Sequence, residues 1–93
     1  MIRWLPKAQE NLDAELQRIA TEDESAAKRI AVLVKSRTEM LEQFPESGRP
    51  GRISGTRELV ISGFPYVLPY RIRCNVVEIL CFFHTAQKPP DRW

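Results

Sequence analysis

Apolar side chains recur at intervals of three and four residues along the first part of the chain. The first stripe with this spacing consists of Ala8, Leu12, Leu16 and Ile19. Such spacing places the four side chains on one face of an α-helix. Pro6 suits the first turn of that helix, because the N–H groups of a first turn have no partner inside the helix. We therefore expect a helix from about Pro6 to Ala20, preceded by a short strand in Met1–Leu5.

A second stripe with the same spacing follows after a short interval. Its apolar members are Ala27, Ile30, Val34, Leu41 and Phe44. Thr21 and Glu24 have the Thr-x-x-Glu spacing of a capping box, which marks a helix start. Pro45 cannot continue a helix, so we expect the second helix to end there. Because the connection between the two helices is so short, they should form an antiparallel hairpin.

The second half of the chain has the pattern of a β-meander. Three segments are rich in β-branched and aromatic residues, namely Arg57–Ile61, Tyr66–Arg73 and Val76–Phe83. Ser62-Gly63 and Cys74-Asn75 separate them as turns, and Asn75 tolerates positive φ. The segment 45–56 holds three of the four glycines and two of the seven prolines, which predicts a loop.

A two-residue turn at Cys74-Asn75 fixes the expected register of the last two strands. Arg71 then lies opposite Glu78, and Val67 lies opposite Phe82. One side of this sheet is nearly all apolar and should face the helices: Leu59, Ile61, Tyr66, Leu68, Tyr70, Ile72, Val77, Ile79, Cys81 and Phe83. The other side is mixed, with Glu58, Val60, Val67, Arg71, Arg73, Glu78, Leu80, Phe82 and, by alternation, His84. Pro69 lacks an N–H, so we expect a bulge or a missing ladder bond beside it.

These elements predict an α+β fold in one domain spanning residues 1–93, with a helical hairpin packed on a small antiparallel sheet. Apolar residues make up 43% of the chain and charged residues 28%, which excludes a disordered protein. No apolar run approaches the ~20 residues of a membrane helix. The first residues also lack the pattern of a signal peptide, so we expect a cytoplasmic protein.

The net charge of +2 conceals an uneven distribution of charge. Residues 1–47 carry 7 basic and 9 acidic side chains, whereas residues 48–93 carry 7 basic and 3 acidic ones. Six of those seven basic residues are arginines, whose planar guanidinium suits phosphate and carboxylate groups. The second half is therefore a candidate surface for an anionic partner, either nucleic acid or an acidic protein segment.

The only cysteines, Cys74 and Cys81, lie on one predicted hairpin with Cys74 at its turn. Seven residues of extended strand separate their α-carbons by ~23 Å, too far for a disulfide, so we expect two free thiols. With a single histidine, the chain has too few soft ligands for a zinc site. We expect neither a metal nor a cofactor.

The order of a strand, a helical hairpin, a Gly/Arg loop and a three-stranded meander resembles the RelE/ParE superfamily. The segments GRPGRISGTRELVI, PYVLPYRIR and VEILCFFHTAQKPP carry the resemblance in series. These proteins are toxins of bacterial type II toxin–antitoxin systems. The resemblance implies a growth inhibitor held silent by a cognate antitoxin, in a hetero-oligomeric complex, without a membrane partner. The antitoxin is expected to contribute an acidic, partly disordered segment.

Two mechanisms follow from the resemblance, and the fold does not distinguish them. RelE-type toxins cleave mRNA in the ribosomal A site, whereas ParE-type toxins bind DNA gyrase and block it without chemistry. We expect ribosome-dependent mRNA cleavage, with gyrase inhibition as the alternative. Both interpretations meet departures. Residues 64–67 contain no basic residue where RelE-type nucleases usually place an arginine, and the tail lacks the tyrosine that these nucleases often have. After His84 the chain reads Thr85-Ala86-Gln87, where ParE-type toxins usually have an Arg-Met-Asp-like run.

The nuclease interpretation assigns a catalytic role to His84, Arg52 and Arg57. His84 is the only histidine and ends the last strand, as a histidine does in many relatives. Imidazole is the side chain best suited to proton transfer near neutral pH, so His84 could act as acid or base. Its alternative role is structural, and Arg57 could instead cap the second helix. Contacts with RNA are expected from Arg49, Arg52, Arg71, Arg73 and Lys88. Arg71 and His84 lie too far apart for one tight site and at most line one groove. The terminal Trp93 could stack on a base or on protein.

Overall fold

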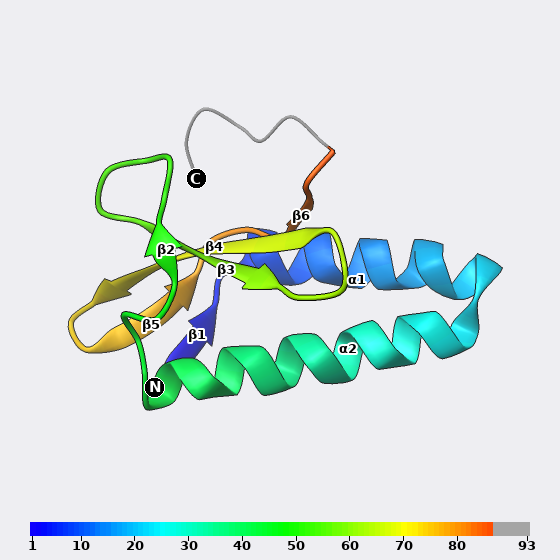
Figure 1. The fold of residues 1–93 in the computed structure, drawn as a ribbon, viewed down its shortest axis with the longest axis horizontal. Helices are drawn as coiled ribbons and strands as arrows, with labels where there is room; N and C mark the ends of the chain where they lie inside the picture. Colours follow the sequence, from blue (N-terminus) through cyan, green and yellow to red (C-terminus); the bar gives the residue numbers. More distant parts are fainter. Residues whose placement is uncertain (87–93) are drawn as a thin grey trace.

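The computed structural model describes residues 1–86; Lys88 and Trp93 lie outside the described residues. Two helices, α1 (Pro6–Glu22) and α2 (Glu24–Glu39), form an antiparallel hairpin, and α2 continues into a short 3-10 helix, η1 (Met40–Glu42). The strands are β1 (Ile2–Trp4), β2 (Arg49–Pro50), β3 (Arg57–Ile61), β4 (Tyr66–Arg73), β5 (Val76–Ile79) and β6 (Phe83–His84). Figure 1 shows the helical hairpin lying against the sheet and extending past it where α1 turns into α2. The predicted α+β architecture is confirmed.

The sheet is antiparallel except at one edge. Its order is β1-β5-β4-β3-β2, with β6 pairing β4 beyond the end of β5. The N-terminal strand β1 runs parallel to β5, with Ile2 opposite Val77 and Trp4 opposite Ile79. The chain that joins these two parallel strands contains the helical hairpin and then β2, β3 and β4, so it is long enough for the crossover that a parallel pairing requires.

Both helix boundaries near the hairpin turn differ from the prediction. Thr21 does not open α2; it still belongs to α1 and its hydroxyl donates to the Arg18 carbonyl. The N-cap is Asp23, whose carboxylate accepts the Ala26 N–H at 3.0 Å. The predicted capping box is wrong, because Asp23 is both the C-cap of α1 and the N-cap of α2. At its other end, α2 tightens into η1 before reaching Pro45.

The predicted third meander strand is broken by a bulge. Tyr70 pairs with Ile79 in β5, whereas Tyr66 pairs with His84 in β6. Four residues of β4 thus face five residues of the partner chain, so one residue is extra. The bulge lies beside Pro69, whose carbonyl accepts the Leu80 N–H at 2.9 Å, and this confirms the expected irregularity there.

The extra residue reverses the predicted sides of the sheet beyond Leu80. Phe82, expected on the mixed side, is buried in the core and stacks on Tyr66 at 4.9 Å between ring centroids. Phe83 is opposite Val67 and is only partly buried, so it does not join the core as predicted. His84 lies on the helix side with Tyr66, not with the arginines. The predicted core position of Ile72 is also wrong, since its side chain is 40% exposed near the hairpin turn.

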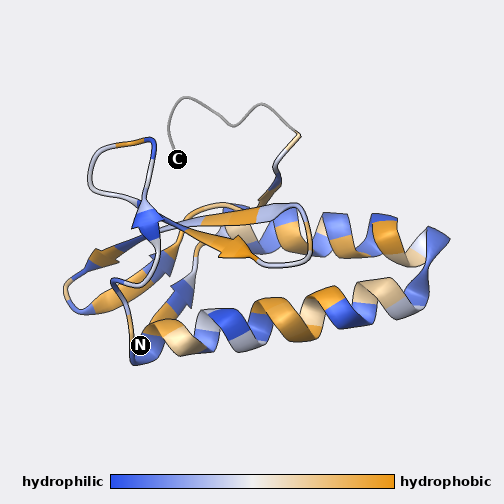
Figure 2. Ribbon diagram, in the orientation of Figure 1, coloured by the Kyte–Doolittle hydropathy of each residue, from blue (hydrophilic) through white to orange (hydrophobic). Residues whose placement is uncertain are grey.

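One hydrophobic core joins the helices to the sheet. Its buried members are Ala8, Leu12, Ile30, Val34, Leu41, Leu59, Ile61, Tyr66, Leu68, Tyr70, Val77, Ile79 and Phe82. Figure 2 shows apolar residues along β3 and β4 and polar residues repeating along both helices. Among the described residues, no helix is both long and apolar enough to cross a membrane.

Candidate functional site

The side of the sheet facing away from the helices carries most of its charged residues. Arg3, Arg49, Arg71 and Arg73 lie there with two buried carboxylates, Glu58 and Glu78. We call these six residues the basic sheet face. Its four guanidiniums exceed its two carboxylates, so the surface is positive and suits an anionic partner.

Each carboxylate of the basic sheet face has an arginine partner. Arg71 Nε donates to Glu78 Oε1 at 2.6 Å, which confirms the predicted cross-strand pair. Arg71, followed by the more distant Arg73 and Arg3, keeps the pKa of Glu78 below its usual value. Arg49 Nε donates to Glu58 Oε1 at 2.9 Å. Arg49 and Arg71, predicted RNA contacts, are thus engaged within the protein, and Arg73 is exposed.

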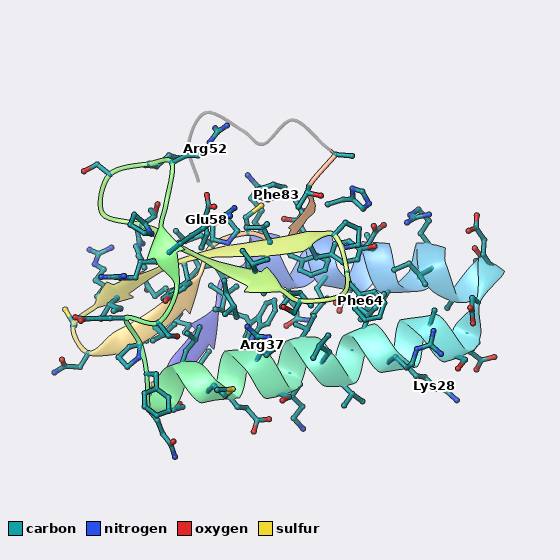
Figure 3. All side chains as sticks on the ribbon, in the orientation of Figure 1. Lys28, Arg37, Arg52, Glu58, Phe64 and Phe83 are labelled. Carbon is teal, nitrogen blue, oxygen red and sulfur yellow. The ribbon has the colours of Figure 1, made fainter. Side chains whose placement is uncertain are left out.

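Arg52 lies near the start of a compact loop between β2 and β3. The loop closes through the Gly51 N–H, which donates to the Thr56 carbonyl at 2.8 Å. Gly51 has no room for a side chain, because a β-carbon there would overlap Thr56. The Arg52 backbone N–H lies 3.4 Å from Glu58 Oε2, and Figure 3 shows the Arg52 side chain on the projecting loop. The loop therefore holds Arg52 above the basic sheet face.

Arg57 and Tyr70 fasten the chain that follows η1. Arg57 donates to the carbonyls of Glu46 and Gly48 at 3.0 and 2.9 Å. The Tyr70 hydroxyl donates to the Pro45 carbonyl and accepts the Gly48 N–H, both at 2.8 Å. Of the two roles expected for Arg57, these contacts favour positioning of the backbone, although they hold the loop and not the last helical turn.

His84 lines a cavity at the opposite end of the sheet. The cavity has a volume of about 260 Å3 and is lined by Asn11, Ala14, Glu15, Arg18, Phe82, Phe83 and His84. The His84 ring meets the Tyr66 ring edge-on, with centroids 5.4 Å apart. Its Nδ1 accepts the Ala86 N–H at 3.0 Å, so a neutral ring carries its proton on Nε2.

A hydrogen-bonded group from α1 forms one wall of this cavity. Arg18 donates to both oxygens of Glu15, at 2.6 and 3.1 Å, and the Tyr66 hydroxyl donates to Glu15 at 2.7 Å. Arg18 is the main cause of the lowered pKa of Glu15, which stays ionised. Burial and the Glu15 carboxylate together raise the pKa of Tyr66 to about 12. Tyr66 is therefore a hydrogen-bond donor at neutral pH.

The predicted catalytic residues do not form one site. Arg57 pairs with Tyr70 and His84 with Tyr66, on different neighbours of β4. Four residues of strand, about 13 Å, separate these two positions along β4. Arg52 projects from the loop beyond β2. Arg71 and His84, which at most could line one groove, lie on opposite sides of the sheet, because the bulge moves His84 to the helix side.

Sequence reasoning missed Asn11, Glu15 and Arg18. Their spacing of four and three residues places them on one face of α1, next to its apolar stripe, and this polar spacing was the available signal. Cys81, a free and buried thiol, lies 3.3 Å from Asn11 Oδ1, and burial raises its pKa. Cys74 is free and exposed. Within residues 1–86, no group of three or more His, Cys, Asp or Glu could hold a metal.

The helical hairpin, the meander and the basic sheet face together define a RelE/ParE-like toxin. Residues 2–89 match the family described as "ParE toxin of type II toxin-antitoxin system, parDE". The chain is 43% identical over 90 residues to the Sinorhizobium fredii (strain NGR234) protein Y4kP, which carries the name of a toxin. That alignment covers 97% of this chain and 93% of the relative.

A solved structure shares the fold at lower sequence identity. It is described as the chromosomal ParDE system from P. aeruginosa and superposes with a TM-score of 0.81. Its sequence is 23% identical, and the match covers 89% of this chain and 92% of that one. The chain belongs to the ParE family of type II toxins, a family whose members have a cognate antitoxin.

Proposed function

We propose that this toxin arrests growth by binding DNA gyrase and blocking it, without cleaving RNA. The separation of His84 from Arg52 and Arg57 is the observation that carries the proposal. Cleavage of RNA by attack of its own 2′-hydroxyl needs an acid, a base and charge stabilisation around one phosphate. An inhibitor that acts by binding needs no such cluster. Membership in the ParE family and the absence of a basic residue in 64–67 point the same way.

The outer side of α2 and η1 offers a surface for a protein target. Val32, Met40 and Phe44 are 69%, 52% and 56% exposed, although all three are large apolar residues. Val32 and Met40 border a shallow cleft of about 470 Å3. Clustered exposed apolar residues are typical of protein–protein contacts. We therefore assign gyrase binding to this α2 surface.

Ribosome-dependent mRNA cleavage is the second candidate, because the basic sheet face and Arg52 could follow an RNA backbone. In that case Arg49, Arg52, Arg71 and Arg73 bind phosphates, while His84, Arg52 and Arg57 act at the cleaved bond. Lys88, the remaining expected RNA contact, lies outside the described residues. This candidate requires a conformational change on the ribosome that brings His84 close to Arg52 and Arg57.

The two candidates are separated by adding the purified chain to a gyrase supercoiling assay and to a translating extract. We expect blocked supercoiling and intact mRNA. Met40→Asp should weaken the inhibition at least tenfold, because it places a charge in the apolar contact. Lys28→Asp, an exposed change elsewhere on α2, is the matched control. New mRNA ends that require ribosomes, with normal supercoiling, would overturn the proposal.

A further inference from the structure

The basic sheet face shares no residue with the α2 surface to which gyrase binding is assigned. It lies on the side of the sheet that faces away from the helices, whereas Val32, Met40 and Phe44 belong to the helical hairpin and the chain just after it. A toxin that contacts a protein through α2 therefore keeps four guanidiniums open to a second partner. Arginine-rich surfaces suit phosphate or carboxylate groups.

Glu58 and Glu78 orient the arginines of this face but do not neutralise it. Arg49 and Arg71 each donate an Nε–H to one of these buried carboxylates, whereas a guanidinium has five N–H donors. The side chains of Arg3 and Arg49 are 66% and 59% exposed in spite of their ion pairs. Several N–H groups of each arginine are therefore accessible to an anion from outside the chain.

The strand register divides the four arginines into two groups. Arg3, Arg71 and Arg73 lie together at the end of three neighbouring strands, β1, β5 and β4. Arg49 lies on β2, two strands away from β4 and two residues back along it. Strand geometry places the α-carbons of Arg49 and Arg71 roughly 12 Å apart. The major groove of B-DNA is also about 12 Å wide, so the two groups are spaced to meet phosphates on its two sides.

The basic sheet face consists of arginine and glutamate and carries no aromatic residue. Proteins that bind single strands combine positive charge with aromatic rings on which unpaired bases stack. The tyrosines of β4, Tyr66 and Tyr70, cannot serve in this way because both are buried in the core on the helix side. A duplex keeps its bases stacked and presents its phosphates to the protein, so charge alone can bind it. The face therefore fits a duplex better than a single strand.

We propose that the basic sheet face binds the phosphate backbone of duplex DNA, with Arg3, Arg71 and Arg73 on one strand and Arg49 on the other, without reading the base sequence. Because gyrase acts on duplex DNA, the toxin would contact the enzyme and its DNA through different sides. This setting rests on the proposed function, whereas the DNA contact itself does not.

The test measures the fluorescence anisotropy of a labelled 20-base-pair duplex as the purified chain is added, without gyrase. We expect a Kd of about 1–100 µM, as is usual for binding that does not depend on sequence. The logarithm of the affinity should fall with the logarithm of the salt concentration with a slope of about −3 to −4, which corresponds to four phosphate contacts. Two duplexes of unrelated sequence should bind equally, and either single strand should bind more weakly.

The double variant Arg3→Gln, Arg73→Gln should weaken duplex binding roughly tenfold and make the salt slope less steep by about 2. Both side chains are exposed, and Arg71 still holds Glu78, so the variant should keep its circular dichroism spectrum and melting temperature. Lys28→Gln combined with Arg29→Gln is the matched control. It removes the same two charges from α2, where they contact only Glu24 and Ser25 in the described chain.

Three results would overturn the proposal: no binding of the duplex at 50 mM salt, equal losses in the two double variants, or tighter binding of single-stranded RNA. The last result would favour mRNA as the partner of this face. A chain that binds the duplex but does not inhibit gyrase would refute the proposed function alone. A chain that inhibits gyrase without binding the duplex would refute this inference alone.

Discussion

The two ends of β4 differ in how regularly they pair with the neighbouring strand. From Arg73 to Tyr70 the strand pairs with β5 residue by residue, so alternation assigns every side chain to its correct side. At the other end, β6 is displaced by one residue, and alternation gives the opposite side. As a result, Arg71 and Arg73 at the hairpin end face away from the helices, whereas His84 faces α1.

Each end also fixes a tyrosine in its own way. The Tyr70 hydroxyl bonds two backbone groups of the chain after η1, and Gly48 lies too close to it to carry a β-carbon. The Tyr66 hydroxyl bonds one carboxylate, which Arg18 also holds. At the regular end, Tyr70 therefore holds backbone groups in place, whereas at the bulged end Tyr66 holds a charged side chain beside a cavity. The predictions below test this contrast, beginning with the largest expected effect.

Phe82 and Phe83 give the sharpest test of the bulge. Phe82→Ala should lower the free energy of unfolding by about 3 kcal/mol, because it empties a core position stacked on Tyr66. Phe83→Ala should cost clearly less, since Phe83 is only partly buried. Urea unfolding measures both. Equal losses of unfolding free energy, or a larger loss for Phe83→Ala, would contradict the bulge and support the unbroken strand expected from the sequence.

Removal of the two tyrosine hydroxyls compares the two ends directly. Tyr70→Phe should cost about 2 kcal/mol, because the buried Gly48 N–H and the Pro45 carbonyl both lose a partner. Tyr66→Phe should cost about half as much, since Glu15 retains Arg18. Chemical denaturation gives both values. A larger loss for Tyr66→Phe would contradict the assignment of the backbone-fixing role to Tyr70.

The acid stability of the two ends should follow Glu15 and Glu78. Both carboxyls have a lowered pKa in the folded chain, chiefly because of Arg18 and Arg71. A carboxyl with a depressed pKa stabilises the fold above its unfolded value of about 4.3, and the stabilisation is lost as pH falls through the folded value. Glu15→Gln and Glu78→Gln should each flatten the decline in stability below pH 5. Carboxyl NMR titration of the unchanged protein would show ordinary values if the pairs do not form.

The smallest effect is expected for Arg71→Ala at the hairpin end. The Arg71 side chain is 38% exposed, and the buried Glu78 carboxylate keeps Arg3 at 4.0 Å, so loss of this cross-strand pair should cost little. The urea midpoint should barely move, and the pKa of Glu78 should rise toward its ordinary value. A large loss of stability would show that the basic sheet face is structural, and not a surface available to partners.

Local patterns predicted most of the fold, and the failures have physical causes. The bounds of β3 and β4 and the Arg71–Glu78 pair follow from alternation and a two-residue turn whose Cys74 and Asn75 both adopt positive φ. The missing N–H of Pro69 indicated an irregularity, but the sequence does not say which strand receives the extra residue. The sides assigned to Phe82, Phe83 and His84 depended on that choice.

The candidate site was less predictable because its parts come from distant segments. Arg57 was expected at the catalytic site or as a helix cap, yet its guanidinium donates to loop carbonyls whose position only the folded chain defines. Asn11, Glu15 and Arg18 join His84 across more than sixty residues of sequence. Alternation and helical spacing describe one element at a time, so they predict neither the contact of Arg57 with the loop nor that of the α1 residues with His84.

The central claim is that inhibition depends on binding a target and not on RNA chemistry. The most direct measurement is gyrase supercoiling with increasing amounts of the unchanged toxin and of a His84→Gln, Arg52→Gln double variant. We predict equal inhibition by the two proteins, with ribosome-bound mRNA intact in a parallel reaction. The account would be contradicted by normal supercoiling together with mRNA cleavage that the double variant has lost.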